Sequence, residues 1–222
     1  MKLNRERRVM VGVCCLLALA VALVGSGKIE LHKVTETHAP VVMAHPDVVP
    51  EWAARLGSPA AMMEMSGYLF SYGRVAQDEK ALKAAMALWR CAAARGDARA
   101  QLLVASLYGA GGILPKDEAQ AVRWYRKAAE QGLAEAQFYL GVCYDFGKGV
   151  PQSSREAVRW YRAAAEQGQA NAQYNLACCY EEGEGVEQDA EAARAWYGKA
   201  AAQGHAEARE ALPELREKDA DR

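Results

Sequence analysis

Small apolar and aromatic side chains recur at helical spacing along most of the chain, with polar residues between them. Ala136, Leu140 and Tyr144 follow one another four residues apart, so they share one face of a helix. Ala157 and Tyr161 begin a second run of the same kind. The pattern therefore predicts two amphipathic helices, one after the other, with alanines and aromatic rings on the faces that they bury.

Glycines separate the two predicted helices. Gly147 follows the first run and Gly168 follows the second, and glycine reaches the left-handed conformation at a helix C-terminus at little cost. Residues 147–151, with the sequence GKGVP, form the expected turn. We expect large Trp and Tyr side chains of one helix to fill the space where its neighbour carries Ala or Gly.

The two-helix pattern repeats every 36 residues. Residues 98–133, 134–169 and 170–205 are three units in register, and a degenerate unit precedes them at about 62–97. A period of about 20 to 50 residues indicates a stacked array of supersecondary units. Residues 206–216 begin like another unit but reach Pro213, so we expect a capping helix there.

The central unit reads AxAQxxLGxxYxxGxGV and then AxxWYxxAAxQG. This pattern resembles the Sel-one-like repeat (SLR) family, which is related to the tetratricopeptide repeats. The resemblance implies an all-α fold, a right-handed superhelical solenoid of stacked helix pairs (an α/α superhelix) over residues 59–216. It also implies a non-enzymatic scaffold or adaptor that binds protein partners.

Two of the units depart from the family pattern. The unit at 98–133 has Val104 and Ala105 where the pattern has Leu and Gly, and Ile113 replaces the second turn glycine. In the degenerate unit, Leu88 replaces the Trp and Val75 the first glycine. Terminal repeats are often atypical because one of their sides faces solvent.

Residues 1–27 resemble a membrane-directed segment. Four basic residues precede an uncharged apolar run at 9–24, which is short for a membrane-spanning helix and slightly long for a signal peptide. Both an uncleaved signal-anchor and a cleaved signal peptide remain open. In either case the basic flank stays in the cytoplasm, so we expect the repeats in the periplasm, tethered to the cytoplasmic membrane or released.

Residues 28–58 show no sustained periodicity and contain several prolines, so they are predicted to be a linker. The linker holds His32, His38 and His45, but their spacing matches no common set of metal ligands, and we expect no metal site. Residues 217–222 are a charged tail.

Four cysteines follow the linker: Cys91, Cys143, Cys178 and Cys179. Exported relatives of the family have disulfide-linked repeats, which keeps that alternative open. Cys143 and Cys179 occupy the same position in successive units, where stacked helices lie about 9 to 10 Å apart, beyond the reach of a disulfide. We therefore favour buried, reduced thiols.

The sequence contains no motif of a known catalytic centre. GxSxG, HExxH, CxxC, Ser-x-x-Lys and a phosphate-binding loop are all missing. The chain carries a net charge of −1, and residues 1–27 carry +3, so the remainder carries −4 and is a poor match for nucleic acid. We predict no enzyme activity and no cofactor. The alternative is an envelope hydrolase, because some exported relatives have been linked to penicillin binding.

The repeat pattern leaves one face of each first helix free of packing. In tetratricopeptide-like stacks that face lines a concave groove, so the resemblance implies a binding site for a protein or peptide segment there. The candidate residues are Arg99, Leu102, Ser106, Glu135, Phe138, Val142, Phe146, Asn171 and Tyr174. The alternative interpretation is that Phe138 and Tyr174 only fill the space between adjacent first helices.

Overall fold

The computed structural model describes residues 58–111 and 114–212. These residues form α-helices and no strand, as the periodicity predicted. The apolar run at 9–24, nearly all of the predicted linker, Ile113, Pro213 and the tail lie outside the described residues. The described residues fall into two compact units, which divide between Ala100 and Gln101.

The first unit contains an antiparallel helix pair, α4 (Pro59–Ala76) and α5 (Glu79–Ala94). Asp78 begins α5, because its carboxylate accepts hydrogen bonds from the backbone N–H groups of Lys80 and Ala81. The ring of Trp89 lies 5.0 Å from that of Phe70, and Trp89 is buried. Trp89 thus fills the position that a Tyr occupies in the other units.

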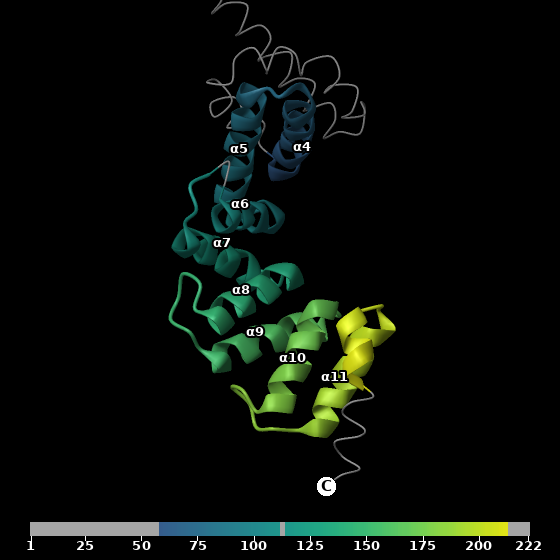
Figure 1. The fold of residues 1–222 in the computed structure, drawn as a ribbon. Coiled ribbons are helices and arrows are strands. Elements are labelled where there is room, and N and C mark those ends of the chain that lie inside the picture. The colour runs from purple at the N-terminus through teal and green to yellow at the C-terminus, as the bar shows by residue number, and fades with distance from the viewer. Residues whose placement is uncertain (1–57, 112–113, 213–222) are drawn as a thin grey trace, which may run out of the picture. The chain divides into compact units, whose positions relative to one another are not determined.

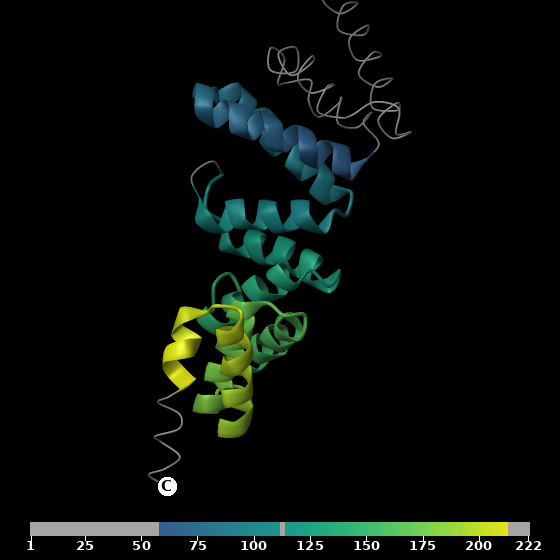
Figure 2. The same ribbon diagram turned by 90° about the vertical axis from the view of Figure 1, so that its right-hand side faces the viewer.

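The second unit continues the alternation of first and second helices (Figure 1). The helix α6 begins just before the boundary between the two units and lies mostly in the second. The helices are α6 (Ala98–Ala110), α7 (Glu118–Glu130), α8 (Ala134–Phe146), α9 (Ser154–Glu166), α10 (Ala170–Glu182) and α11 (Ala190–Ala202). Residues 206–212 are helical and pack beside α11 through the buried Ala208 (Figure 2).

Each second helix starts at a side-chain cap. Asp117, Ser153 and Asp189 accept hydrogen bonds from backbone N–H groups three residues later. The first helices end at Gly147 and Gly183, with φ angles of 65° and 74°. The glycine at the end of the first helix, predicted from the sequence, is therefore present in both complete units.

The core of the central unit forms around Tyr161, which is completely buried. Its ring packs against Gly141, where an added Cβ would lie only 2.6 Å from a ring carbon. The expectation of a large ring against a small residue is thus confirmed for Tyr161. Trp160 differs: it is only partly buried, because adjacent residues of a helix point about 100° apart.

Candidate partner-binding face

Buried glutamines hold the first helices in register with the second helices. Gln137 of α8 donates to the carbonyl of Ala129 in the preceding repeat, and it accepts a hydrogen bond from Gln167 in its own repeat. One repeat later, Gln173 makes the same two contacts: it donates to the carbonyl of Ala165 and accepts from Gln203. Because each of these bonds joins a first helix to a second helix, together they fix the rotation of α8 and α10 about their axes.

We call the candidate residues of α8 and α10 the first-helix face: Glu135, Phe138, Val142, Phe146, Asn171 and Tyr174. They come from two successive repeats of the second unit. Glu135 and Asn171 are exposed, and each lies in the first turn of its helix. The face therefore has polar residues at its N-terminal end.

Phe138 is half-buried and has a packing role. Its ring centroid lies 5.3 Å from that of Tyr139 and 6.1 Å from that of Tyr161. Val142 packs against the same core cluster, which lies between α9 and α10. The buried parts of Phe138 and Val142 therefore pack as the second interpretation expects. Both side chains are only partly buried, so their outer parts are accessible to a partner.

Phe146 is the most accessible aromatic residue of this face, with 65% of its surface exposed. The ammonium group of Lys148, in the turn after α8, lies 5.1 Å from its ring centroid. A large aromatic side chain at this exposure contributes little to the core, and most of its surface is accessible to another molecule.

Tyr174 packs against the turn that follows α11. Its ring stacks on that of His205 with centroids 4.6 Å apart, and it lies 5.5 Å from the ring of Tyr197. Burial is the main cause that raises the pKa of Tyr174 to about 12, with further contributions from Cys178. Tyr174 is therefore neutral at physiological pH.

The remaining candidates lie outside α8 and α10. Leu102 and Ser106 are half-buried on α6, and the Ser106 hydroxyl donates to the Leu102 carbonyl and lies 3.3 Å from the Tyr125 hydroxyl. Arg99 belongs to the first unit and is exposed. That the nine candidate residues form a binding site remains a prediction.

Two carboxylates on α8 and α10 were not among the candidates. Asp145 accepts a hydrogen bond from the Tyr161 hydroxyl and Glu181 from the Tyr197 hydroxyl, each at 3.0 Å. Burial, and next the charge of Asp145, raises the pKa of Tyr161 well above its usual range, so the phenol remains a donor. The sequence signal that could have identified them is the acidic residue at the same position of the repeats 134–169 and 170–205.

Cys143, Cys178 and Cys179 are not activated nucleophiles. All four in the described part of the chain are free. Burial raises the pKa of Cys143 to about 11 and that of Cys179 to about 12, and it also raises the pKa of Cys178. These three thiols are therefore protonated at neutral pH, and the thiolate is the reactive form.

Neither a metal site nor a membrane span is found among residues 58–111 and 114–212. No group of three or more His, Cys, Asp or Glu side chains there is arranged to hold a metal ion. None of the helices in these ranges is long and apolar enough to cross a membrane. The predicted segment at 9–24 lies outside these ranges.

The repeat pattern matches a known family over most of the chain. Residues 59–97, 98–133, 134–169 and 170–205 each match the Sel1 repeat. The chain belongs to the Sel1 repeat family. The resemblance noted in the sequence is thus confirmed, and Sel1 repeats generally mediate protein–protein interactions.

Solved structures of other Sel1 repeat proteins are similar to this one. A protective antigen of uropathogenic Escherichia coli strains, which displays an SLR fold, is 40% identical with a TM-score of 0.64. The match covers 70% of this chain and 32% of the antigen, so the chain spans about a third of that protein. A Sel1 repeat protein from Oxalobacter formigenes is also 40% identical, with a TM-score of 0.54, over 57% of this chain and 95% of the other. No curated protein matches the chain.

Proposed function

We propose that this Sel1 repeat protein is a non-enzymatic scaffold or adaptor of the bacterial cell envelope that binds a protein segment on its first-helix face. The observation that carries the proposal is Phe146, a large aromatic side chain left 65% exposed on α8. Exposed aromatics of this kind are frequent anchors at protein interfaces. In the right-handed superhelix that the family resemblance implies, α8 and α10 present this face along a concave groove.

Two other aromatic rings of α8 support a binding role. Tyr139 is 36% exposed on the same helix, and the half-buried Phe138 lies against it. These rings are already held by the core on one side, because Tyr139 stacks on Tyr125 at 5.4 Å. Rings that are fixed before binding lose little conformational entropy when a partner covers them.

The envelope location rests on the sequence of residues 1–27. The basic flank followed by the apolar run at 9–24 favours export of the repeats with the N-terminus in the cytoplasm. If the run is an uncleaved anchor, the full-length mass will remain in the membrane fraction after an alkaline wash. A soluble species that begins near Gly27 would instead establish a cleaved signal peptide. No observation among the described residues favours the hydrolase alternative.

The proposal is tested with a photo-crosslinking amino acid in the full-length protein in bacterial cells. One variant carries it in place of Phe146, and the control carries it in place of the exposed Arg159 on the second helix α9. We expect a discrete crosslinked protein from position 146 and none of it from position 159. The same products from both positions, or none from position 146, would contradict the proposal.

A further inference from the structure

Charge is divided unequally between the first and second helices of the second unit. α8 and α10 contain four acidic residues and no Lys or Arg: Glu135, Asp145, Glu181 and Glu182. The second helices α7, α9 and α11 carry eight basic side chains against five acidic ones. The basic residues are Arg123, Arg126, Lys127, Arg155, Arg159, Arg162, Arg194 and Lys199, and the acidic ones Glu118, Glu130, Glu156, Glu166 and Glu191.

Many of the basic side chains are engaged by aromatic residues away from the first-helix face. Arg126 donates to the Tyr144 hydroxyl at 2.8 Å, and Arg162 makes the same contact with Tyr180 at 2.9 Å. The cations of Lys127, Arg159 and Lys199 lie over the rings of Trp124, Trp160 and Trp196, at 4.4, 5.1 and 3.7 Å from the centroids. The contacts with the Trp rings keep Lys127, Arg159 and Lys199 on their own second helices. Arg126 and Arg162 reach hydroxyls on α8 and α10, but at positions outside the first-helix face.

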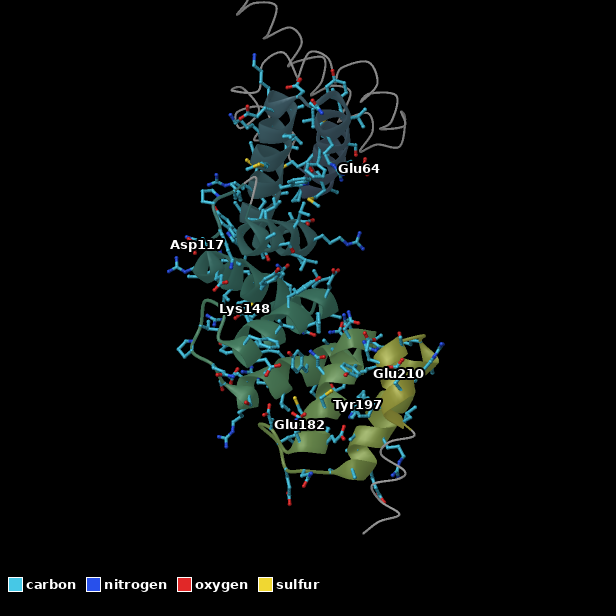
Figure 3. The ribbon with its side chains drawn as sticks, in the orientation of Figure 1. Glu64, Asp117, Lys148, Glu182, Tyr197 and Glu210 are labelled. Atoms are coloured by element: carbon cyan, nitrogen blue, oxygen red, sulfur yellow. The ribbon has the colours of Figure 1, made fainter. Side chains whose placement is uncertain are left out.

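Two carboxylates of the first helices are open to solvent. Glu135 and Glu182 are exposed, and no basic side chain is seen to pair with either of them among the residues described. Glu182 lies at the C-terminal end of α10, at the repeat position that Phe146 occupies on α8 (Figure 3). Lys148 contacts the Phe146 ring instead of a carboxylate.

The combination of rings and carboxylates fits one class of side chain. Lys and Arg have an aliphatic stem that covers an aromatic ring and a cationic end that reaches a carboxylate. Lys148 over Phe146 is an example of such a contact within the chain itself. Helices that carry charges of one sign, as α8 and α10 do, also attract segments of the opposite sign and repel those of their own.

We propose that the segment bound by the first-helix face is a basic stretch of polypeptide. Its Lys or Arg side chains pair with Glu135 and Glu182, and one of its aliphatic or aromatic side chains packs on Phe146. This inference rests on the proposed function, because it names the chemistry of the partner at the same face. An acidic segment or an uncharged apolar segment is excluded by it.

The first experiment selects binders from a random library of twelve-residue peptides displayed on phage, with the intact protein immobilised. We expect the selected peptides to be enriched in Lys and Arg relative to the unselected library and to carry at least one large apolar residue. Selected peptides that are neutral or acidic, or no selection above background, would overturn the inference.

The second experiment measures the dissociation constant of the best selected peptide by fluorescence anisotropy. Glu135→Gln with Glu182→Gln, the face variant, removes the two exposed negative charges of α8 and α10. The control, Glu130→Gln with Glu166→Gln, removes two from exposed positions on α7 and α9. We expect binding to weaken about 5- to 20-fold in the face variant, less than twofold in the control, and to depend less on salt in the face variant.

An equal loss in both variants would attribute binding to net charge and overturn the inference. The proposed function is tested separately, because crosslinking at position 146 does not depend on the charge of the partner. A crosslinked partner together with selected peptides that lack basic residues would keep the function and reject the basic segment.

Discussion

The two complete repeats, residues 134–169 and 170–205, share most of the residues that build the stack and differ in several that face outward from it. In the first helices, α8 and α10 have the same residue at the buried alanine, glutamine, leucine and cysteine positions. They differ at the positions of Glu135, Phe138, Val142 and Phe146, which in α10 are Asn171, Tyr174, Cys178 and Glu182. The comparison separates the requirements of the fold from the residues available for recognition.

The largest effect should come from the shared ring of the second helix. Tyr161→Ala removes a completely buried side chain that fills the space over Gly141, and we expect a loss of about 3 to 5 kcal/mol in the free energy of unfolding. Trp160→Ala should cost less, about 1 to 3 kcal/mol, because the indole is partly exposed and its buried N–H has no hydrogen-bond partner in the described structure.

Urea unfolding followed by circular dichroism compares the two variants. A larger loss for Trp160→Ala than for Tyr161→Ala would show that the indole, and not the phenol, is the main core ring.

The next effect tests how successive units are joined. Gly149 has a φ of 70°, and a Cβ added there would overlap the backbone carbonyl of Glu118 in the preceding unit. Gly149→Ala should therefore destabilise the protein by about 2 to 3 kcal/mol through left-handed strain and overlap. Gly147→Ala is the matched control, because its φ is similar but its nearest neighbour is the side chain of Gln152. Equal thermal midpoints for the two variants would show that the close approach of Gly149 to Glu118 does not affect stability.

A smaller effect is expected for the glutamines that link the units. Gln137→Ala leaves the buried carbonyl of Ala129 without its side-chain donor, at a cost of about 1 to 3 kcal/mol. The equivalent change one repeat later, Gln173→Ala, should cost the same within about 1 kcal/mol, since its contact with Ala165 has the same geometry. Denaturant midpoints provide the measurement, and a loss in only one of the two variants would show that the repeats are not equivalent.

The shared cysteines predict a modest dependence of stability on pH. Burial raises the pKa of Cys143 to about 11 and that of Cys179 to about 12, above the value of about 8.5 for an unfolded thiol. Their contribution is therefore fully present below about pH 8.5 and is lost as the pH rises through the folded values.

We expect Cys143→Ala with Cys179→Ala to reduce the decline in unfolding free energy between pH 8.5 and about pH 9.5 by about 1 to 2 kcal/mol. Urea titrations at several pH values measure this decline, and the parent protein is the reference. An unchanged slope in the double variant would show that the thiols titrate normally.

The sequence predicted the stack better than the surface. The 36-residue period established two helices per unit, and Gly147 correctly marked the end of the first. The sequence pattern did not show which of Trp160 and Tyr161 is the main core ring, because both fit a broad apolar face. Only the packing against Gly141 identifies Tyr161 as that ring.

The candidate face was harder to predict because its residues have two roles. Tyr174 has the spacing of a groove residue, yet its ring stacks on His205, a contact that a single-unit pattern does not contain. The sequence places Gly149 in a turn, but its close approach to Glu118 depends on the preceding repeat. Such contacts follow from how units stack, which the period alone does not specify.

The most direct test of the central claim exchanges two exposed residues that differ between the repeats, Phe146→Glu together with Glu182→Phe. Composition and net charge stay the same, and neither side chain is buried, so the thermal midpoint should stay within about 2 °C of the parent. The affinity for the partner crosslinked at position 146 should fall at least about tenfold, equivalent to about 1.4 kcal/mol. An affinity equal to that of the parent would contradict the claim that the outward residues of α8 and α10 carry recognition.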